Sequence, residues 1–203
     1  MEQTLVAAHG LFAERGYADV KMDEIAAAIG VTKPLLYNYF GNKERLYIAC
    51  MERAGDALTA AVTEAVTAAD RPRDALGAGV HAFFAFLDAD RAAWAVLFDD
   101  TLPHRGEVAE RVAEYRGRIL DFVSASMLAQ LPREERDGAA IEVEALSTAL
   151  LGSAEALARW WLRTEALSAD EVAELLIATI DPGLRSRSQR PSSPSPRKGN
   201  TSA

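Results

Sequence analysis

The segment from Val31 to Leu46, VTKPLLYNYFGNKERL, mixes polar, basic and aromatic side chains with a few aliphatic ones. Six of its side chains fall outside the expected helix core and would point outward: Thr32, Lys33, Pro34, Leu35, Asn38 and Tyr39. Hydroxyl, amide and ammonium groups can hydrogen-bond to base edges, and apolar side chains can contact a thymine methyl. A short helix that exposes such groups fits the width of the major groove, so this segment could read DNA.

The spacing around these side chains predicts a helix, a tight turn and a second helix between residues 22 and 39. Ala26 is small enough for the two helices to cross closely, and Gly30 can adopt the positive φ of a tight turn. Val31 and Leu36 can fill the core that the two helices share. The polar and aromatic side chains are then left for the surface.

The sequences AERGY and MDEIAAAIGVTKPLLYNYFGNKERL resemble the helix-turn-helix domain of the TetR family of bacterial transcriptional regulators. The resemblance covers residues 1–47, and the motif itself occupies residues 21–40. The Gly-Tyr pair after the first helix, the Gly-Val pair of the turn and the later Lys-Glu pair all occur in register. The rest of the chain is similar to the family only in helix number and general composition.

This resemblance implies a role for each exposed side chain of the motif. Tyr37 and Lys43 fall on phosphate-contacting positions, and Lys43 would also begin a helix whose first N–H groups can face a phosphate. The six outward side chains would face the bases. Lys33 could then donate to guanine, Asn38 could pair with adenine, and Leu35 could touch a thymine methyl.

Two positions depart from the family pattern. Lys21 stands where a Ser or Thr usually caps the second helix, which forfeits a cap worth about 1 kcal/mol but could add a phosphate contact. Only Met1 and Glu2 precede the first helix, where members commonly carry a basic arm. Either the true start lies upstream or the arm is missing.

Alanine and leucine dominate the chain, and apolar residues recur at intervals of three and four, so we expect an all-α protein without strands. The pattern predicts a three-helix N-terminal domain and a larger helical C-terminal domain, with about nine helices in all. They are expected over residues 2–15, 22–29, 32–40, from 42 onward, 72–87, 90–98, 107–131, 137–163 and 169–180.

Charge and composition divide the chain into three parts. Residues 1–47 are nearly neutral, whereas residues 48–182 carry 24 acidic against 12 basic side chains. An acidic body is a poor surface for a polyanion, so it should serve ligand binding and dimerisation. Residues 183–203 carry 5 basic and no acidic side chains, are rich in Ser and Pro, and are expected to be disordered.

Aromatic side chains concentrate in the acidic body, where helices could enclose an apolar cavity. The family resemblance implies that a small-molecule inducer binds there. The residues predicted to line the cavity are Phe86, Trp94, Phe98, Tyr115 and Phe122. The nearby charged residues Asp99, Asp100, Arg116 and Arg118 are expected to face solvent instead.

Small residues recur at helical spacing on the penultimate predicted helix, which allows another helix to approach closely. They are Ala145, Ala149, Gly152, Ser153 and Ala156. They could pack within the subunit, but in the family the last two helices of each subunit form a four-helix dimer interface. The last helix would then contribute Val172, Leu175, Leu176 and Thr179.

Other functions find little support in the sequence. His9, His81 and His104 are too far apart to suggest a metal site, and Cys50 has neither a disulfide partner nor an evident catalytic base. There is no nucleophile-elbow serine and no phosphate-binding glycine loop. We therefore expect no enzyme, metal or cofactor. With no signal peptide or membrane span, a cytoplasmic location is expected.

The sequence thus predicts a ligand-responsive, homodimeric regulator that binds double-stranded DNA. It is expected to be a repressor that an unknown small-molecule inducer releases from a pseudo-palindromic operator. An activator remains an alternative. A further alternative is a helical dimer that binds other proteins and keeps a vestigial DNA-binding head. The net charge of −8 favours this alternative.

Overall fold

The computed structural model describes residues 2–98 and 101–188, without the side chains of residues 2, 72–73 and 181–188. The described residues form nine α-helices and no strand, which confirms the all-α prediction. The helices are α1 (Glu2–Asp19), α2 (Met22–Ala28), α3 (Lys33–Phe40), α4 (Lys43–Ala68), α5 (Pro72–Ala89), α6 (Arg91–Leu97), α7 (Glu107–Ala129), α8 (Arg133–Thr164) and α9 (Ala169–Ser188). None of them is long and apolar enough to cross a membrane.

Side-chain caps set several helix starts. Asn42 Oδ1 accepts from the backbone N–H of Arg45 at 2.8 Å, and Asp90 Oδ1 accepts from Ala93 at 3.0 Å. Ser168 and Glu171 form a capping box before α9. Thr32 takes the N-cap position of α3, but its side chain makes no capping hydrogen bond.

The observed helix ends differ from the predicted ones by more than two residues at three places. The first predicted helix ends at residue 15; Gly16 does break the helical backbone at φ 76°, but a further helical turn continues to Asp19. α8 begins about one turn earlier than predicted, at Arg133. α9 continues to Ser188, so residues 183–188 are helical and the prediction of disorder is wrong there. Residues 189–203 lie outside the described part of the chain.

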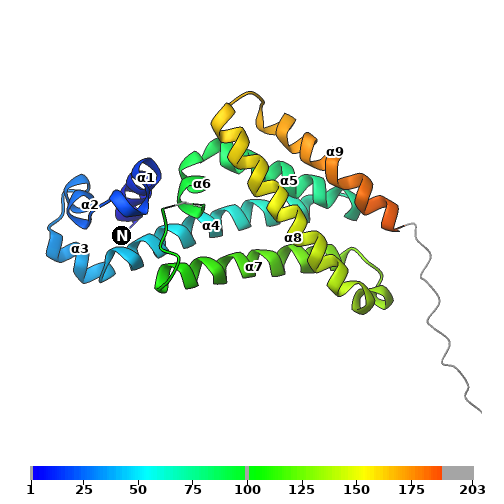
Figure 1. The fold of residues 1–203 in the computed structure, drawn as a ribbon, viewed down its shortest axis with the longest axis horizontal. Coiled ribbons are helices and arrows are strands. Elements are labelled where there is room, and N and C mark those ends of the chain that lie inside the picture. Colours follow the sequence, from blue (N-terminus) through cyan, green and yellow to red (C-terminus); the bar gives the residue numbers. More distant parts are fainter. Residues whose placement is uncertain (1, 99–100, 189–203) are drawn as a thin grey trace, which may run out of the picture.

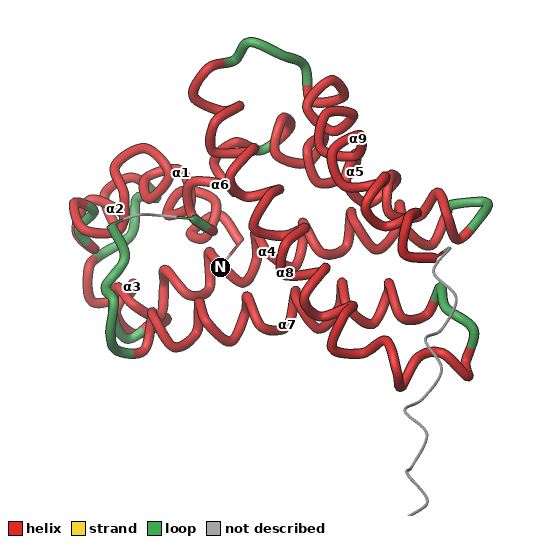
Figure 2. The backbone as a smooth tube through the Cα atoms, turned by 45° about the vertical axis from the view of Figure 1, so that its right-hand side comes forward, coloured by secondary structure: helices red, strands yellow, loops and turns green. Residues whose placement is uncertain are grey.

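The helices are arranged as a head and a body that share one long helix (Figure 1). α1, α2 and α3 form the head, and α4 runs from it into the body, where α5 and α7 pack against it. α8 packs on α7, and α9 lies along α5; Figure 2 shows the same arrangement from another side. The predicted domain boundary at residues 47 and 48 therefore falls inside α4.

Two hydrophobic cores hold this arrangement together. The first combines buried residues of the head with residues of α4, α6 and α7, and its aromatic centre is Phe12, Tyr17 and Tyr47, whose rings lie within 6.3 Å of one another. The second lies among α5, α8 and α9 around Phe84 and Trp161. Because the first core spans both parts, displacement of α4 or α6 will be felt by the head.

Candidate DNA-binding surface and ligand cavity

The turn between α2 and α3 has the geometry that the sequence predicts. Gly30 has a φ of 70°, and the N–H of Val31 donates to the carbonyl oxygen of Ala26 at 3.0 Å. Ile25 and Leu36 are almost fully buried and pack in the core that the two helices share. The turn and this core fix the angle of α3 and decide which of its sides faces outward.

The outward side of α3 is uncovered. All six residues predicted to face DNA bases are exposed: Thr32, Lys33, Pro34, Leu35, Asn38 and Tyr39. Tyr39 is the most exposed of its large apolar side chains, at 61%, and Tyr37 is exposed at 39%. No described segment of the chain lies over this surface, which therefore remains available to a partner.

Acidic residues of the head neutralise part of its positive charge. Lys33 Nζ lies 2.8 Å from Asp23 Oδ1, and this partner raises the pKa of Lys33. Arg15 pairs with Glu24 at 3.0 Å. The backbone N–H of Lys21 donates to Glu24 at 2.8 Å, which lowers the pKa of that carboxyl. Glu24 thus supplies half of a capping box, and the exposed Lys21 side chain can contact a phosphate.

Lys43 has a structural role that the sequence does not predict. Its Nζ donates to the carbonyl oxygens of Tyr17, Ala18 and Val20 at 2.8, 3.3 and 3.1 Å, and lies 4.3 Å from the centre of the Tyr17 ring. It thereby satisfies carbonyl groups where α1 ends. Burial lowers the pKa of Lys43. Its ammonium group points into the head, so only the N–H groups at the start of α4 are positioned for a phosphate.

The body contains an apolar cavity of about 380 Å³, within the range of small-molecule sites. Of the five predicted aromatic residues, Phe98, Tyr115 and Phe122 line it. Phe86 and Trp94 do not, so the prediction is wrong for these two in this cavity. Trp94 stacks on Phe98 with ring centres 4.1 Å apart and belongs to the second core, against which Phe86 also packs.

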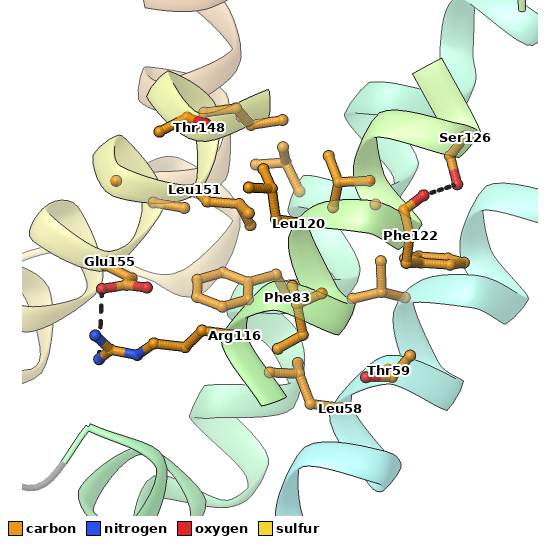
Figure 3. A pocket seen from close by; sticks show the side chains of 18 of the residues that line it. Leu58, Thr59, Phe83, Arg116, Leu120, Phe122, Ser126, Thr148, Leu151 and Glu155 are labelled. Atoms are coloured by element: carbon orange, nitrogen blue, oxygen red, sulfur yellow. Dashed lines mark hydrogen bonds and ion pairs between the residues drawn. The ribbon is translucent and has the colours of Figure 1, made fainter. Parts of the chain in front are cut away.

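Polar groups are few in the cavity wall, and the close view in Figure 3 shows several of them. Arg116 and Glu155 are its charged residues and lie 3.9 Å apart. Arg116 is exposed, as predicted, and its guanidinium also lies 5.4 Å from the Phe98 ring of the cavity wall. The hydroxyl groups of Tyr115 and Thr59 are 3.2 Å apart. Of the other charged residues, Arg118 is exposed, as predicted, whereas Asp99 and Asp100 lie outside the described residues.

The outer side of α8 and α9 is exposed. The small residues of the predicted interface, Ala145, Ala149, Gly152, Ser153 and Ala156, are all exposed, as are Leu175 and Thr179. Ile141, 84% exposed, extends the same surface of α8. Val172 and Leu176 are only 0% and 4% exposed and belong to the second core, so their prediction as interface residues is wrong.

Three contacts that the sequence did not reveal connect the head, or the adjoining first turns of α4, with the body. Tyr47 Oη donates to the carbonyl oxygen of Val96 on α6 at 2.5 Å. Arg45 lies 3.8 Å from Glu107 at the start of α7. Thr101, between α6 and α7, accepts from the N–H of Ala18 at 3.4 Å. No motif marks these residues, because each contact depends on how α6 and the segment after it pack against the head.

A helix-turn-helix head joined by one long helix to a cavity-bearing body of five further helices defines a class of two-domain helical regulators. Residues 5–50 match the family model of bacterial regulatory proteins of the tetR family, and residues 72–181 match that of the tetracyclin repressor-like C-terminal domain. The chain belongs to the TetR family.

Individual relatives support this assignment. The transcriptional activator FasR of Mycolicibacterium smegmatis is 38% identical over 110 residues, which cover 54% of this chain and 50% of FasR. The chain thus spans about half the length of this curated relative. A TetR-like regulator from Rhodococcus sp. RHA1 superposes with a TM-score of 0.72 at 28% identity, covering 91% of this chain and 94% of that one. FadR of Bacillus subtilis, crystallised with stearoyl-CoA, superposes at 0.74 with 18% identity, covering 88% and 96%.

Proposed function

We propose that the chain is a ligand-responsive transcriptional regulator that binds duplex DNA as a homodimer. The observation that carries this proposal is the uncovered outer side of α3, where polar and aromatic side chains surround the buried Leu36. These exposed side chains do not take part in the packing of the core. Lys21, Thr32, Lys33, Pro34, Leu35, Tyr37, Asn38 and Tyr39 form the proposed DNA-binding surface, together with the N–H groups at the start of α4.

The exposed side of α8 and α9 supports dimerisation. An apolar stripe of small residues next to Ile141 and Leu175 would be costly to leave in water and lets a second copy approach closely. A two-fold dimer would place two copies of α3 in successive major grooves, about 34 Å apart. The operator is then a pseudo-palindrome.

The apolar cavity supports control by a small molecule. A ligand could prefer a conformation in which the spacing of the two heads no longer matches the spacing of the major grooves. Binding of this ligand would shift the dimer away from DNA, and the ligand would then act as an inducer that relieves repression. An activator is the alternative, and the FasR relative is named a transcriptional activator. We favour the repressor and a cytoplasmic location.

An affinity measurement tests the proposal. Duplex DNA from upstream of the chain's own gene is titrated with the wild type, with the double variant Asn38→Ala and Tyr39→Ala, and with the control Glu64→Ala, which is exposed on α4. The double variant should lose roughly 2 kcal/mol or more of specific binding energy, since each base contact contributes about 1–3 kcal/mol. Equal affinities for all three proteins would contradict the proposed surface.

The pairing of Lys33 and Arg15 with acids favours a second candidate, a protein-interaction module with a vestigial head. Lys21→Ala distinguishes the two. A regulator should lose affinity for every duplex and show a shallower salt dependence, whereas an interaction module should bind no duplex even at low salt. Lys43→Ala is less suitable, because it would also remove the contacts with three carbonyl groups of the head.

A further inference from the structure

The cavity is elongated. A round cavity of 380 Å³ would be about 9 Å across, yet its lining residues on α4 run from Met51 to Val66, about 22 Å of helix axis. On α7 they run from Val112 to Met127, again about 22 Å. Aliphatic and aromatic side chains dominate along this length. The space fits a slender apolar chain better than a compact ring system.

The charge in the wall lies toward the head-proximal part of this length. Figure 1 shows that α7 starts beside the head and runs away from it along α4. Arg116 lies about one turn after Val112, the first lining residue of α7, and Figure 3 shows its side chain reaching toward Glu155. The two charged groups are 3.9 Å apart and both partly exposed, so water screens their attraction. An anion can therefore replace Glu155 as the partner of Arg116 at small cost.

A second hollow continues from this point. It also measures about 380 Å³ and shares Leu97, Phe98, Val112 and Arg116 with the first cavity. Leu102, Pro103 and His104, from the segment between α6 and α7, line it as well. Pro103 and His104 are exposed, so this hollow opens to solvent, where a charged group keeps part of its hydration.

We propose that the two hollows form one site for an amphipathic ligand, a linear apolar chain with an anionic head group. The chain lies between α4 and α7, and the head group lies beside Arg116 under residues 102–104. This assignment rests on the proposed function, because it names the chemical class of the effector. A free long-chain carboxylate and a coenzyme A thioester both have this chemistry.

The position of the head group also gives it a route to the DNA-binding head. Thr101 directly precedes the segment that lines the second hollow and accepts from the N–H of Ala18. A Cβ atom at Gly16 would lie only 2.9 Å from Thr101 Oγ1, so the fit between this segment and the end of α1 is close. Lys43 binds the carbonyl groups of the same turn. Displacement of residues 102–104 would therefore move the turn that anchors the start of α4.

Direct binding tests the ligand class without DNA. Dodecanoate, dodecanoyl-coenzyme A and uncharged dodecan-1-ol are titrated by calorimetry into the wild type, into Arg116→Met and into the control Arg118→Met. Arg118 is exposed like Arg116 but lies outside the lining. At least one anionic probe should bind the wild type about tenfold more tightly than the alcohol. Arg116→Met should abolish that preference and leave alcohol binding unchanged, and Arg118→Met should keep it.

The two anionic probes distinguish the two sources of the head group. A preference for dodecanoate that depends on Arg116 indicates a free carboxylate, and a preference for dodecanoyl-coenzyme A indicates a thioester. Equal affinity for all three probes, an unchanged preference in Arg116→Met, or no binding of any probe to the wild type would overturn the inference. Thermal unfolding of each variant confirms that it is folded. Since no DNA is present, a negative result in this binding experiment does not contradict the proposed DNA binding. Conversely, a protein that binds no DNA could still show the predicted ligand preference.

A second variant tests the route. Thr101→Ala should bind the preferred probe with wild-type affinity but should reduce the probe's effect on DNA affinity by several-fold. An undiminished effect of the probe on DNA affinity would contradict the route through Thr101.

Discussion

Gly55 lies in the middle of α4, where an alanine would normally stabilise the helix, yet we predict that Gly55→Ala destabilises the protein. A Cβ atom there would lie 2.2 Å from both Cζ and Oη of Tyr115, whereas ordinary contacts begin at 3.4 Å. The ring must therefore move by more than an ångström. Tyr115 is only 5% exposed, so the surrounding core has to move with it.

The magnitude follows from two destabilising effects and one stabilising effect. Overpacking of a core costs about 1–3 kcal/mol. Loss of the hydroxyl contact between Tyr115 and Thr59 costs roughly 0.5–1.5 kcal/mol more. Alanine regains about 1 kcal/mol of helix propensity. The net expectation is a loss of about 0.5–3.5 kcal/mol in the free energy of unfolding. Tyr115 also lines the cavity, so ligand binding should weaken in parallel.

Gly117→Ala is the matched control. Gly117 is an exposed glycine within α7, two positions from Tyr115, and no atom lies within 4 Å of its prospective Cβ. It should gain about 0.5–1 kcal/mol. Urea unfolding of both variants at one protein concentration, followed by far-ultraviolet circular dichroism, measures the difference. If Gly55→Ala is as stable as Gly117→Ala, the close approach of α4 and α7 at Tyr115 is refuted.

Three further predictions concern a thiol, a histidine and the outer surface. Burial raises the pKa of Cys50 to about 12, so a thiol reagent at pH 8 should modify the unfolded but not the native protein; rapid native labelling would contradict this. Burial, opposed by Asp90, lowers the pKa of His9 below its ordinary value. The unfolded chain then binds more protons, so stability should fall as pH drops below about 6.5. Urea titrations across pH should show a shallower fall in His9→Leu. Ala149→Glu should convert the proposed dimer to monomer in light scattering, because the two-fold would place like charges together; a dimer that persists in this variant would exclude this surface.

The local features of the head could be predicted from the sequence because they depend on short-range chemistry. Helical spacing and the positive φ of Gly30 decide that Leu36 is buried and that Asn38 and Tyr39 are exposed. Caps such as Asn42 act within three residues, so sequence spacing alone identifies them.

Features that depend on the packing of distant helices could not be predicted in this way. Lys43 turns to carbonyl groups 23 to 26 positions earlier in the chain, which no local pattern encodes. α9 has apolar residues on more than one side, and only its packing on α5 shows that Val172 and Leu176 face inward. Likewise Trp94 is an aromatic residue close in sequence to Phe98, which lines the cavity, and no local pattern separates the two. Only the structure shows that Trp94 belongs to the second core.

A nuclease-protection experiment on the DNA upstream of the chain's own gene tests the central claim most directly. The wild type should protect two related half-sites whose centres are about 10 base pairs apart, or a multiple of that spacing, because two copies of α3 lie on one side of the duplex. The double variant Asn38→Ala and Tyr39→Ala should leave the same DNA unprotected. Absence of any protection by the wild type at low salt, where phosphate contacts are strongest, would contradict the account.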